Sequence, residues 1–278
     1  MAGFFGLFNY DKPGKGVDKN APPKKRFFLF FELYFRKFWK ILRLSFLYFA
    51  FFVPAIAVYF FTGYLRLPVW LIFMLTGIFA LPVGAASAGC SLVLRNMARE
   101  DPVFLASDFF DGVKNNWKQA TAVCFIDIAV AFLAVMDIGA GGQINMGAFR
   151  SLYVVGLIVV FSLYLFMHYY IYTMMVTFEL KLRRLYKNAF ILALAGLGRN
   201  VFITLILGFL TFAFTSLIRV PILILMPFLM GTYGFIISFI SYPLLKKVML
   251  DPAARQQEEE AEEAEEAGLR DTAGENKF

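Results

Sequence analysis

Two ionisable residues, Asp127 and His168, lie inside long apolar stretches of the sequence. Charged groups within a membrane are costly, and those found there serve ion or proton pathways or polar contacts between helices. Each lies eight residues from the same end of its stretch, which is about 12 Å along a helix. Because consecutive spans run antiparallel, we expect the two side chains to meet. The pair could relay protons or could tie two helices together, and the sequence leaves both roles open.

The stretches that carry these residues belong to a chain whose composition is that of a membrane protein. Apolar residues make up 60% of the 278 residues, which leaves too little polar surface for a soluble globule. A helix needs about 20 apolar residues to cross a bilayer. Six stretches meet or approach this length: 42–61, 68–94, 119–137, 151–176, 201–218 and 221–245. The sequence predicts an all-α membrane protein with six transmembrane helices.

Positive charges give the predicted orientation. If the N-terminus lies in the cytosol, 24 of the 27 Lys and Arg residues fall on the cytoplasmic side, and only Arg66, Arg150 and Arg219 fall outside. Such asymmetry is typical of multi-spanning proteins. We therefore expect a protein of the bacterial cytoplasmic membrane with both termini in the cytosol. The basic flanks suit anionic lipid headgroups better than nucleic acid, for which no partner role is predicted.

The sequence predicts three regions. Residues 1–26 are a polar cytoplasmic segment without the apolar core of a signal peptide. Residues 27–250 form the six-helix membrane domain. Residues 251–278 form an acidic, disordered cytoplasmic tail, in which 256–267 contain seven Glu.

Amphipathic segments precede the first, third and fifth apolar stretches. Polar and apolar residues alternate at helical spacing in 27–43, in 108–118 and at the start of 181–200, as in helices that lie at a membrane interface. Three cytoplasmic interfacial helices are predicted, each followed by a hairpin of spans. They suggest a threefold parallel repeat.

Small residues are concentrated in the second stretch and predict close helix packing there. They are Gly84, Ala85, Ala88 and Gly89, which follow Pro82.

Signatures of enzymes are missing from the sequence. It has a single histidine, no Gly-rich phosphate loop ending in Lys-Ser or Lys-Thr, and no Gly-x-Ser-x-Gly elbow. Cys90 and Cys124 have no metal-ligand spacing and are expected to pack as small residues. We predict no enzyme activity, no catalytic residues, no metal and no cofactor.

Several short motifs resemble those of one family. They are Gly-Phe-Phe-Gly-Leu-Phe-Asn at 3–9, Leu-Pro-Val-Gly at 81–84, Leu-Val-Leu-Arg at 92–95, Ser-Asp-Phe-Phe at 107–110 and Lys-Asn-Asn-Trp-Lys-Gln at 114–119. With these motifs the chain resembles the YesL family of uncharacterised bacterial membrane proteins. The resemblance implies a genetic neighbourhood of carbohydrate uptake systems and their sensor kinases. It assigns no site residues.

Two functions are compatible with these features. The first is a non-enzymatic accessory or regulatory role with a carbohydrate ABC-type importer or a sensor kinase, through a cytoplasmic docking face of Trp39, Phe109, Phe110 and Trp117. The second is a small-solute or proton-coupled transporter or channel that uses Asp127 and His168. The sequence identifies neither the substrate, the partner nor the oligomeric state.

Overall fold

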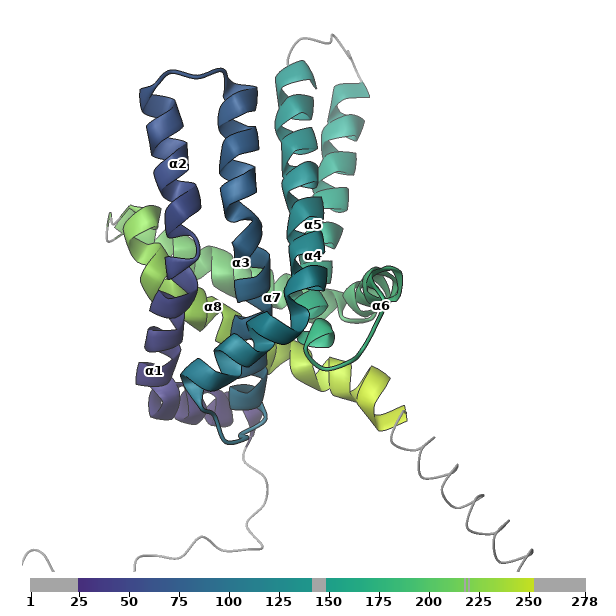
Figure 1. Ribbon diagram of the computed structural model, residues 1–278. Helices are drawn as coiled ribbons and strands as arrows, with labels where there is room; N and C mark the ends of the chain where they lie inside the picture. The colour runs from purple at the N-terminus through teal and green to yellow at the C-terminus, as the bar shows by residue number, and fades with distance from the viewer. Residues whose placement is uncertain (1–24, 142–148, 218, 220, 253–278) are drawn as a thin grey trace, which may run out of the picture. The chain divides into compact units, whose positions relative to one another are not determined.

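The computed structural model describes residues 25–141, 149–217, 219 and 221–252 (Figure 1). The chain divides into two compact units, residues 1–36 and 37–278. Of the first unit, the described residues 25–36 lead into and begin helix α1 (Arg26–Ala50). The rest of α1, from Lys37, and all later helices belong to the second unit. Most of the predicted N-terminal segment and acidic tail lies outside the described residues.

Every regular element in the described ranges is helical. After α1 the helices are α2 (Val53–Tyr64), α3 (Val69–Ala98), α4 (Leu105–Gly141), α5 (Phe149–Met175), α6 (Leu182–Ala195), α7 (Leu197–Phe212) with the π-helical turn η2 (Ala213–Leu217), and α8 (Ile222–Leu245) with η3 (Lys246–Leu250). Five helices, namely α3, α4, α5, α7 and α8 with their extensions, are long and apolar enough to cross a membrane. The bent pair α1–α2 makes a sixth span if counted as one. The protein is an all-α, multi-pass membrane protein.

The first span is broken between α1 and α2. The two helices meet at an angle of 44°, and the break falls at residues 51–52 instead of near residue 43, where the amphipathic segment was expected to end. Pro54 lies in the first turn of α2, and a proline has no N–H to bond a carbonyl of the preceding turn. The proline therefore accounts for the end of the α1 hydrogen-bond ladder at Ala50.

The three amphipathic segments differ in how they join their spans. The first continues without interruption to the end of α1, and the second forms the opening turns of α4. Only the third forms a helix of its own, α6, which ends at Gly196. A Cβ atom at Gly196 would lie 2.7 Å from Leu244 Cδ2 and would also overlap the Tyr170 hydroxyl, so a larger residue would displace these side chains where the chain turns into α7. No Pro or Gly interrupts residues 113–138, and α4 runs on.

Helices α3 and α4 pack with their backbones nearly in contact. A Cβ atom added at Gly84 would lie 2.6 Å from the Cβ of Cys124, and one added at Gly112 would lie 2.8 Å from the Cα of Gly89. A Cβ atom at Gly89 would lie 2.8 Å from Val113 Cγ2. The close packing predicted for the small residues of the second span is thus confirmed, and its partner is α4.

A second region of dense packing joins α5, α6, α7 and α8. Leu185, Leu192 and Leu245 are buried in it. The Tyr170 hydroxyl donates to Asn200 Oδ1 at 2.8 Å, inside the same core. This bond satisfies a buried polar group and links α5 to the start of α7.

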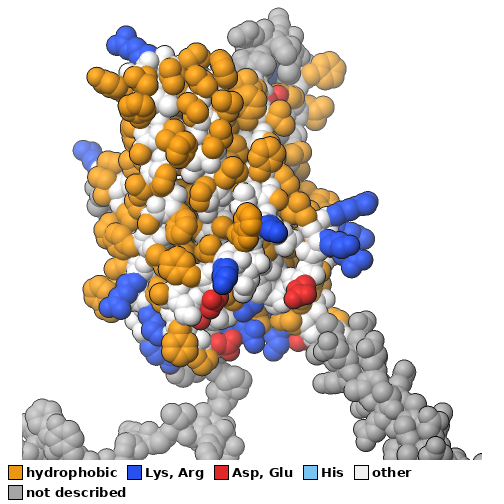
Figure 2. Space-filling model, viewed as in Figure 1, with side chains coloured by type: hydrophobic (Ala, Val, Ile, Leu, Met, Phe, Trp, Pro, Cys, Tyr) orange, Lys and Arg blue, Asp and Glu red, His pale blue; other side chains and the backbone are white. Residues whose placement is uncertain are grey.

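Lys and Arg side chains gather at one end of the helices of the second unit. This end, here called the basic end, carries the side chains of Lys37, Lys40, Arg95, Arg99, Lys114, Lys118, Arg183, Arg184, Lys187, Lys246 and Lys247. Figure 2 shows the blue side chains mainly along the lower and right-hand edges of the view, whereas the upper part is mostly apolar. The split agrees with the charge asymmetry of the sequence.

The α3–α4 contact can be tested by adding one methyl group. Gly89→Ala is expected to lower the free energy of unfolding by about 1–3 kcal/mol, because the new carbon overlaps α4. The control is Gly208→Ala in α7, where an added Cβ meets no atom within 4 Å, and which should be neutral or slightly stabilising. Thermal unfolding in detergent measures both. Equal melting temperatures for the two variants would contradict the close approach.

Candidate functional site

The structure brings Asp127 of α4 and His168 of α5 into contact. His168 Nε2 lies 2.8 Å from Asp127 Oδ1, and the Tyr164 hydroxyl donates to the same oxygen at 2.6 Å. The two side chains are only partly exposed, 20% for His168 and 29% for Asp127. The sequence correctly placed the pair at one depth of neighbouring spans. It did not identify Tyr164, which lies one turn before His168 on α5.

The contacts of the imidazole determine where its protons lie. His168 Nδ1 lies 2.9 Å from the Tyr164 carbonyl oxygen, and a carbonyl can only accept, so Nδ1 carries a hydrogen. The contact between Nε2 and Asp127 Oδ1 then holds a second proton. The pair is therefore either an imidazolium with a carboxylate or a neutral imidazole with a carboxylic acid. Its net charge is zero in both cases, which suits a site within a span.

Asp127 retains one free acceptor. The bonds from Tyr164 and His168 both reach Oδ1, and within the described ranges no side chain or backbone group donates to Oδ2. A carboxylate oxygen without a partner is costly in an apolar medium unless it is protonated or solvated. The arrangement can thus accept a proton, or a hydrogen bond from a small solute.

A phenol from α6 lies beside this pair. The Tyr186 hydroxyl is buried and has no hydrogen-bond partner among the described residues. The Tyr164 side chain of α5 is a close neighbour of this phenol. Burial raises the pKa of Tyr186 to about 12, and the charge of Asp127 adds to the effect. Three helices, α4, α5 and α6, therefore contribute polar groups to this site.

A further polar contact within the spans connects α1 and α3. The hydroxyls of Tyr48 and Ser87 lie 2.7 Å apart, and Ser87 Oγ donates to the Val83 carbonyl at 2.8 Å. Because Ser87 uses its hydrogen for Val83, Tyr48 is the donor to Ser87. This contact was not predicted, because nothing in the sequence distinguishes Tyr48 and Ser87 from the other Tyr and Ser residues of the spans.

Arg95 of α3 is another residue whose role was not foreseen. Its Nη1 donates to the Val176 carbonyl at 2.7 Å and to Thr177 Oγ1 at 3.1 Å, immediately after the end of α5. The last carbonyls of a helix lack partners within it, and a cation there is favourable. Arg95 therefore caps α5 and joins it to α3.

The predicted docking face is only partly present. Trp39, Phe110 and Trp117 are 69%, 52% and 53% exposed, as expected. Phe109 is fully buried and its ring packs 5.8 Å from that of Phe51, so its assignment to an exposed face is wrong. The close approach of α4 to α3 turns Phe109 toward the protein interior, whereas Phe110 and Trp117 stay on the exposed side of α4.

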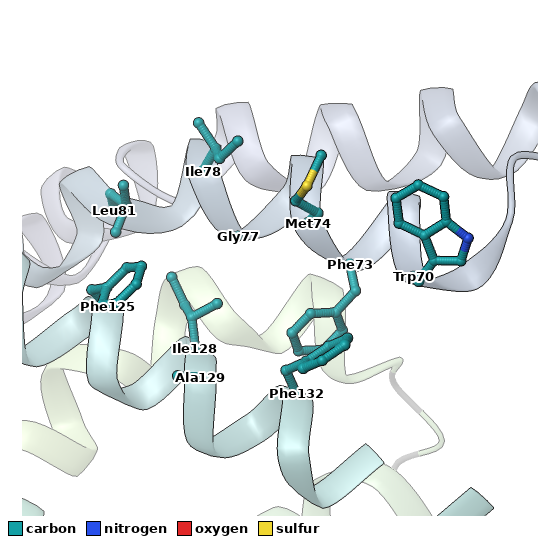
Figure 3. A pocket seen from close by; sticks show the side chains of 10 residues that line it. All are labelled: Trp70, Phe73, Met74, Gly77, Ile78, Leu81, Phe125, Ile128, Ala129 and Phe132. Atoms are coloured by element: carbon teal, nitrogen blue, oxygen red, sulfur yellow. The ribbon is translucent and has the colours of Figure 1, made fainter. Parts of the chain in front are cut away.

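An apolar groove lies between α3 and α4. Its volume is about 340 Å³, and Figure 3 shows side chains of the two helices facing each other across it. The lining residues are Trp70, Phe73, Met74, Gly77, Ile78 and Leu81 of α3 and Phe125, Ile128, Ala129 and Phe132 of α4. With no charged or strongly polar group in its lining, the groove is suited to hydrocarbon.

No three His, Cys, Asp or Glu side chains gather into a possible metal site in the part of the chain that the structure describes. Cys90 and Cys124 are buried free thiols. Among the described residues of α3, α4, α5, α7 and α8, the one contact between an acidic and a basic side chain is that of Asp127 with His168.

One family model matches part of the chain. Residues 67–138 match the family "Protein of unknown function, DUF624". This stretch contains the α3–α4 contact and Asp127, but neither Tyr164 nor His168. The match is consistent with the resemblance to the YesL family, whose members carry this domain. No curated protein and no solved structure matches the chain.

The proton positions at His168 can be measured directly, because the chain has one histidine. In ¹⁵N-histidine-labelled protein, the NMR spectrum is expected to show a protonated Nδ1 throughout the neutral range. Asp127→Asn should keep the proton on Nδ1 and leave a neutral imidazole, since its amide can donate to Nε2. A wild-type signal from an imidazole with a bare Nδ1 would contradict the assigned contacts.

Proposed function

We propose that this protein is a non-enzymatic accessory or regulatory subunit in the bacterial cytoplasmic membrane, which acts with a carbohydrate ABC-type importer or with its sensor kinase. In this proposal the basic end faces the cytosol, together with both termini. Partner subunits would dock on the exposed aromatic side chains at this end.

One observation carries the proposal: Trp39, Phe110 and Trp117 remain largely exposed at the basic end of the helices. Large aromatic residues are the commonest anchors of protein interfaces. Lys118 lies over the Trp117 ring at 5.6 Å, so part of this surface combines an aromatic ring with a cation. The resemblance to a family encoded beside carbohydrate uptake systems supports an importer or kinase as the partner. Lipid headgroups are the competing occupant of the same side chains.

The docking proposal predicts a loss of partner binding in one double variant. Phe110→Ala with Trp117→Ala is expected to reduce the recovery of importer or kinase subunits, after mild crosslinking in the native cell, by about tenfold. The control is Trp70→Ala with Phe79→Ala, two side chains of α3 that are 55% and 46% exposed. It should leave recovery unchanged. If wild-type protein recovers no such subunit, or if both variants behave alike, the proposal fails.

A second candidate function is favoured by the contact between Asp127 and His168. A carboxyl group, an imidazole and two phenols within or beside the spans, with one carboxylate oxygen open, are the groups used by proton-coupled transporters and channels. We therefore propose, as the second function, a small-solute or proton-coupled transporter or channel that uses Asp127 and His168.

Flux measurements test this second function. In proteoliposomes with a pH gradient, wild-type protein is expected to carry protons or a sugar, and Asp127→Asn or His168→Gln should reduce this flux by about 100-fold, as for loss of a proton-transfer group. Thr211→Val removes a different hydrogen bond within the spans, to Tyr233 at 2.7 Å, and should leave flux intact. Equal flux in all three variants would remove Asp127 and His168 from the pathway.

A further inference from the structure

Helix α6 has an outward face that combines positive charge with apolar surface. Its inward face, with Leu185, Ala189, Leu192 and Ala193, is buried in the core it shares with α5 and α8. Residues at positions i, i+4, i+7 and i+11 fall on one side of a helix. Counted from Arg183, these positions hold Lys187, Phe190 and Leu194, and all four side chains are exposed on the side opposite the buried face. The outward face consists of Arg183, Arg184, Lys187, Phe190, Ile191 and Leu194.

The two properties are separated along the helix axis. The three cations occupy the first two turns, and Phe190, Ile191 and Leu194 follow, with 43%, 47% and 52% of their surface exposed. Within the described ranges, no carboxylate forms an ion pair with Arg183, Arg184 or Lys187. The cations are therefore available to an anion from outside this part of the chain.

The position of α6 suits a membrane interface. It follows the end of the α5 span and precedes the α7 span, and with 14 residues it is too short to cross a membrane itself. Figure 1 shows α6 almost along its axis, so it runs across the direction of α4 and α5. In Figure 2 the blue side chains project from the right-hand edge, where Figure 1 places α6.

The surface next to this face is that of a lipid-facing span. Beyond Gly196, Leu197, Phe202 and Leu205 of α7 are 51%, 56% and 65% exposed. The apolar half of the α6 face is thus followed along the chain by exposed apolar side chains of a helix that is apolar enough to cross a membrane, as a contact with lipid requires. A soluble partner would match the cations but not this continuation.

We propose that the outward face of α6 binds an anionic phospholipid from the leaflet at the basic end. The guanidinium groups of Arg183 and Arg184 and the ammonium group of Lys187 hold the phosphate, since guanidinium matches phosphate oxygens in pairs. An acyl chain lies along Phe190, Ile191 and Leu194. This site stands independently of the docking and transport proposals.

Native mass spectrometry of the full-length protein tests the lipid site. Protein is taken from micelles that contain equal amounts of phosphatidylglycerol and phosphatidylcholine, and the retained lipids are counted. Wild-type protein is expected to favour phosphatidylglycerol by about fivefold or more, and Arg183→Gln/Arg184→Gln/Lys187→Gln should bring the ratio close to one. The control Lys114→Gln/Lys246→Gln/Lys247→Gln removes the same charge from exposed positions on α4 and η3 and should keep the preference.

Three results would overturn the site: no preference in wild-type protein, equal losses in the two triple variants, or release of the lipid by excess inorganic phosphate. The last result would mean that the cations hold a free anion and that the apolar half contributes nothing. Thermal unfolding verifies that each variant is folded. If the α6 triple variant does not fold, the three single variants replace it, and each is expected to lower the preference by about twofold.

Discussion

The close approach of α3 and α4 is the constraint on which the rest of the second unit depends. Gly84, Gly89 and Gly112 let the two backbones meet where any larger residue would overlap. Contacts of this kind suit a membrane, in which lipid is as apolar as the side chains and association relies on van der Waals packing. The contact sets the rotation of α4 about its axis. That rotation buries Phe109, leaves Phe110 and Trp117 outside, and directs Asp127 toward α5.

Several polar groups within the spans are satisfied by other spans. Tyr164 and His168 both reach Asp127, and Tyr48 bonds to Ser87. Every such bond replaces water that the bilayer cannot supply. Asp127 Oδ2 and the Tyr186 hydroxyl have no hydrogen-bond partner among the described residues, and the carboxylate of Asp127 is the stronger candidate of the two for exchange with a proton or solute.

Hydropathy and charge predicted the helices and their polarity well, because both follow from the cost of moving single residues into lipid. The depth of Asp127 and His168 could be counted from the ends of their stretches. The burial of Phe109 could not be predicted, because it depends on a contact between glycines of two helices. The apolar stripe that contains Phe109 could equally have faced the membrane surface or the protein interior. The sequence did not indicate the role of Tyr164 either, because tyrosine is frequent throughout this chain. The first amphipathic segment was predicted to end near residue 43, but the helix breaks after Ala50, where Pro54 could have indicated the break.

The cap that Arg95 places on α5 joins segments that are synthesised at different times. Its acceptors, Val176 and Thr177, lie 81 and 82 positions later in the chain. When α3 first enters the membrane, neither acceptor exists, and the guanidinium must be solvated by water or headgroups at the end of the span. Insertion of α5 then exchanges this solvation for two bonds inside the protein. Arg95, in the first half of the chain, thus reaches its final hydrogen bonding only after the fourth span has been made.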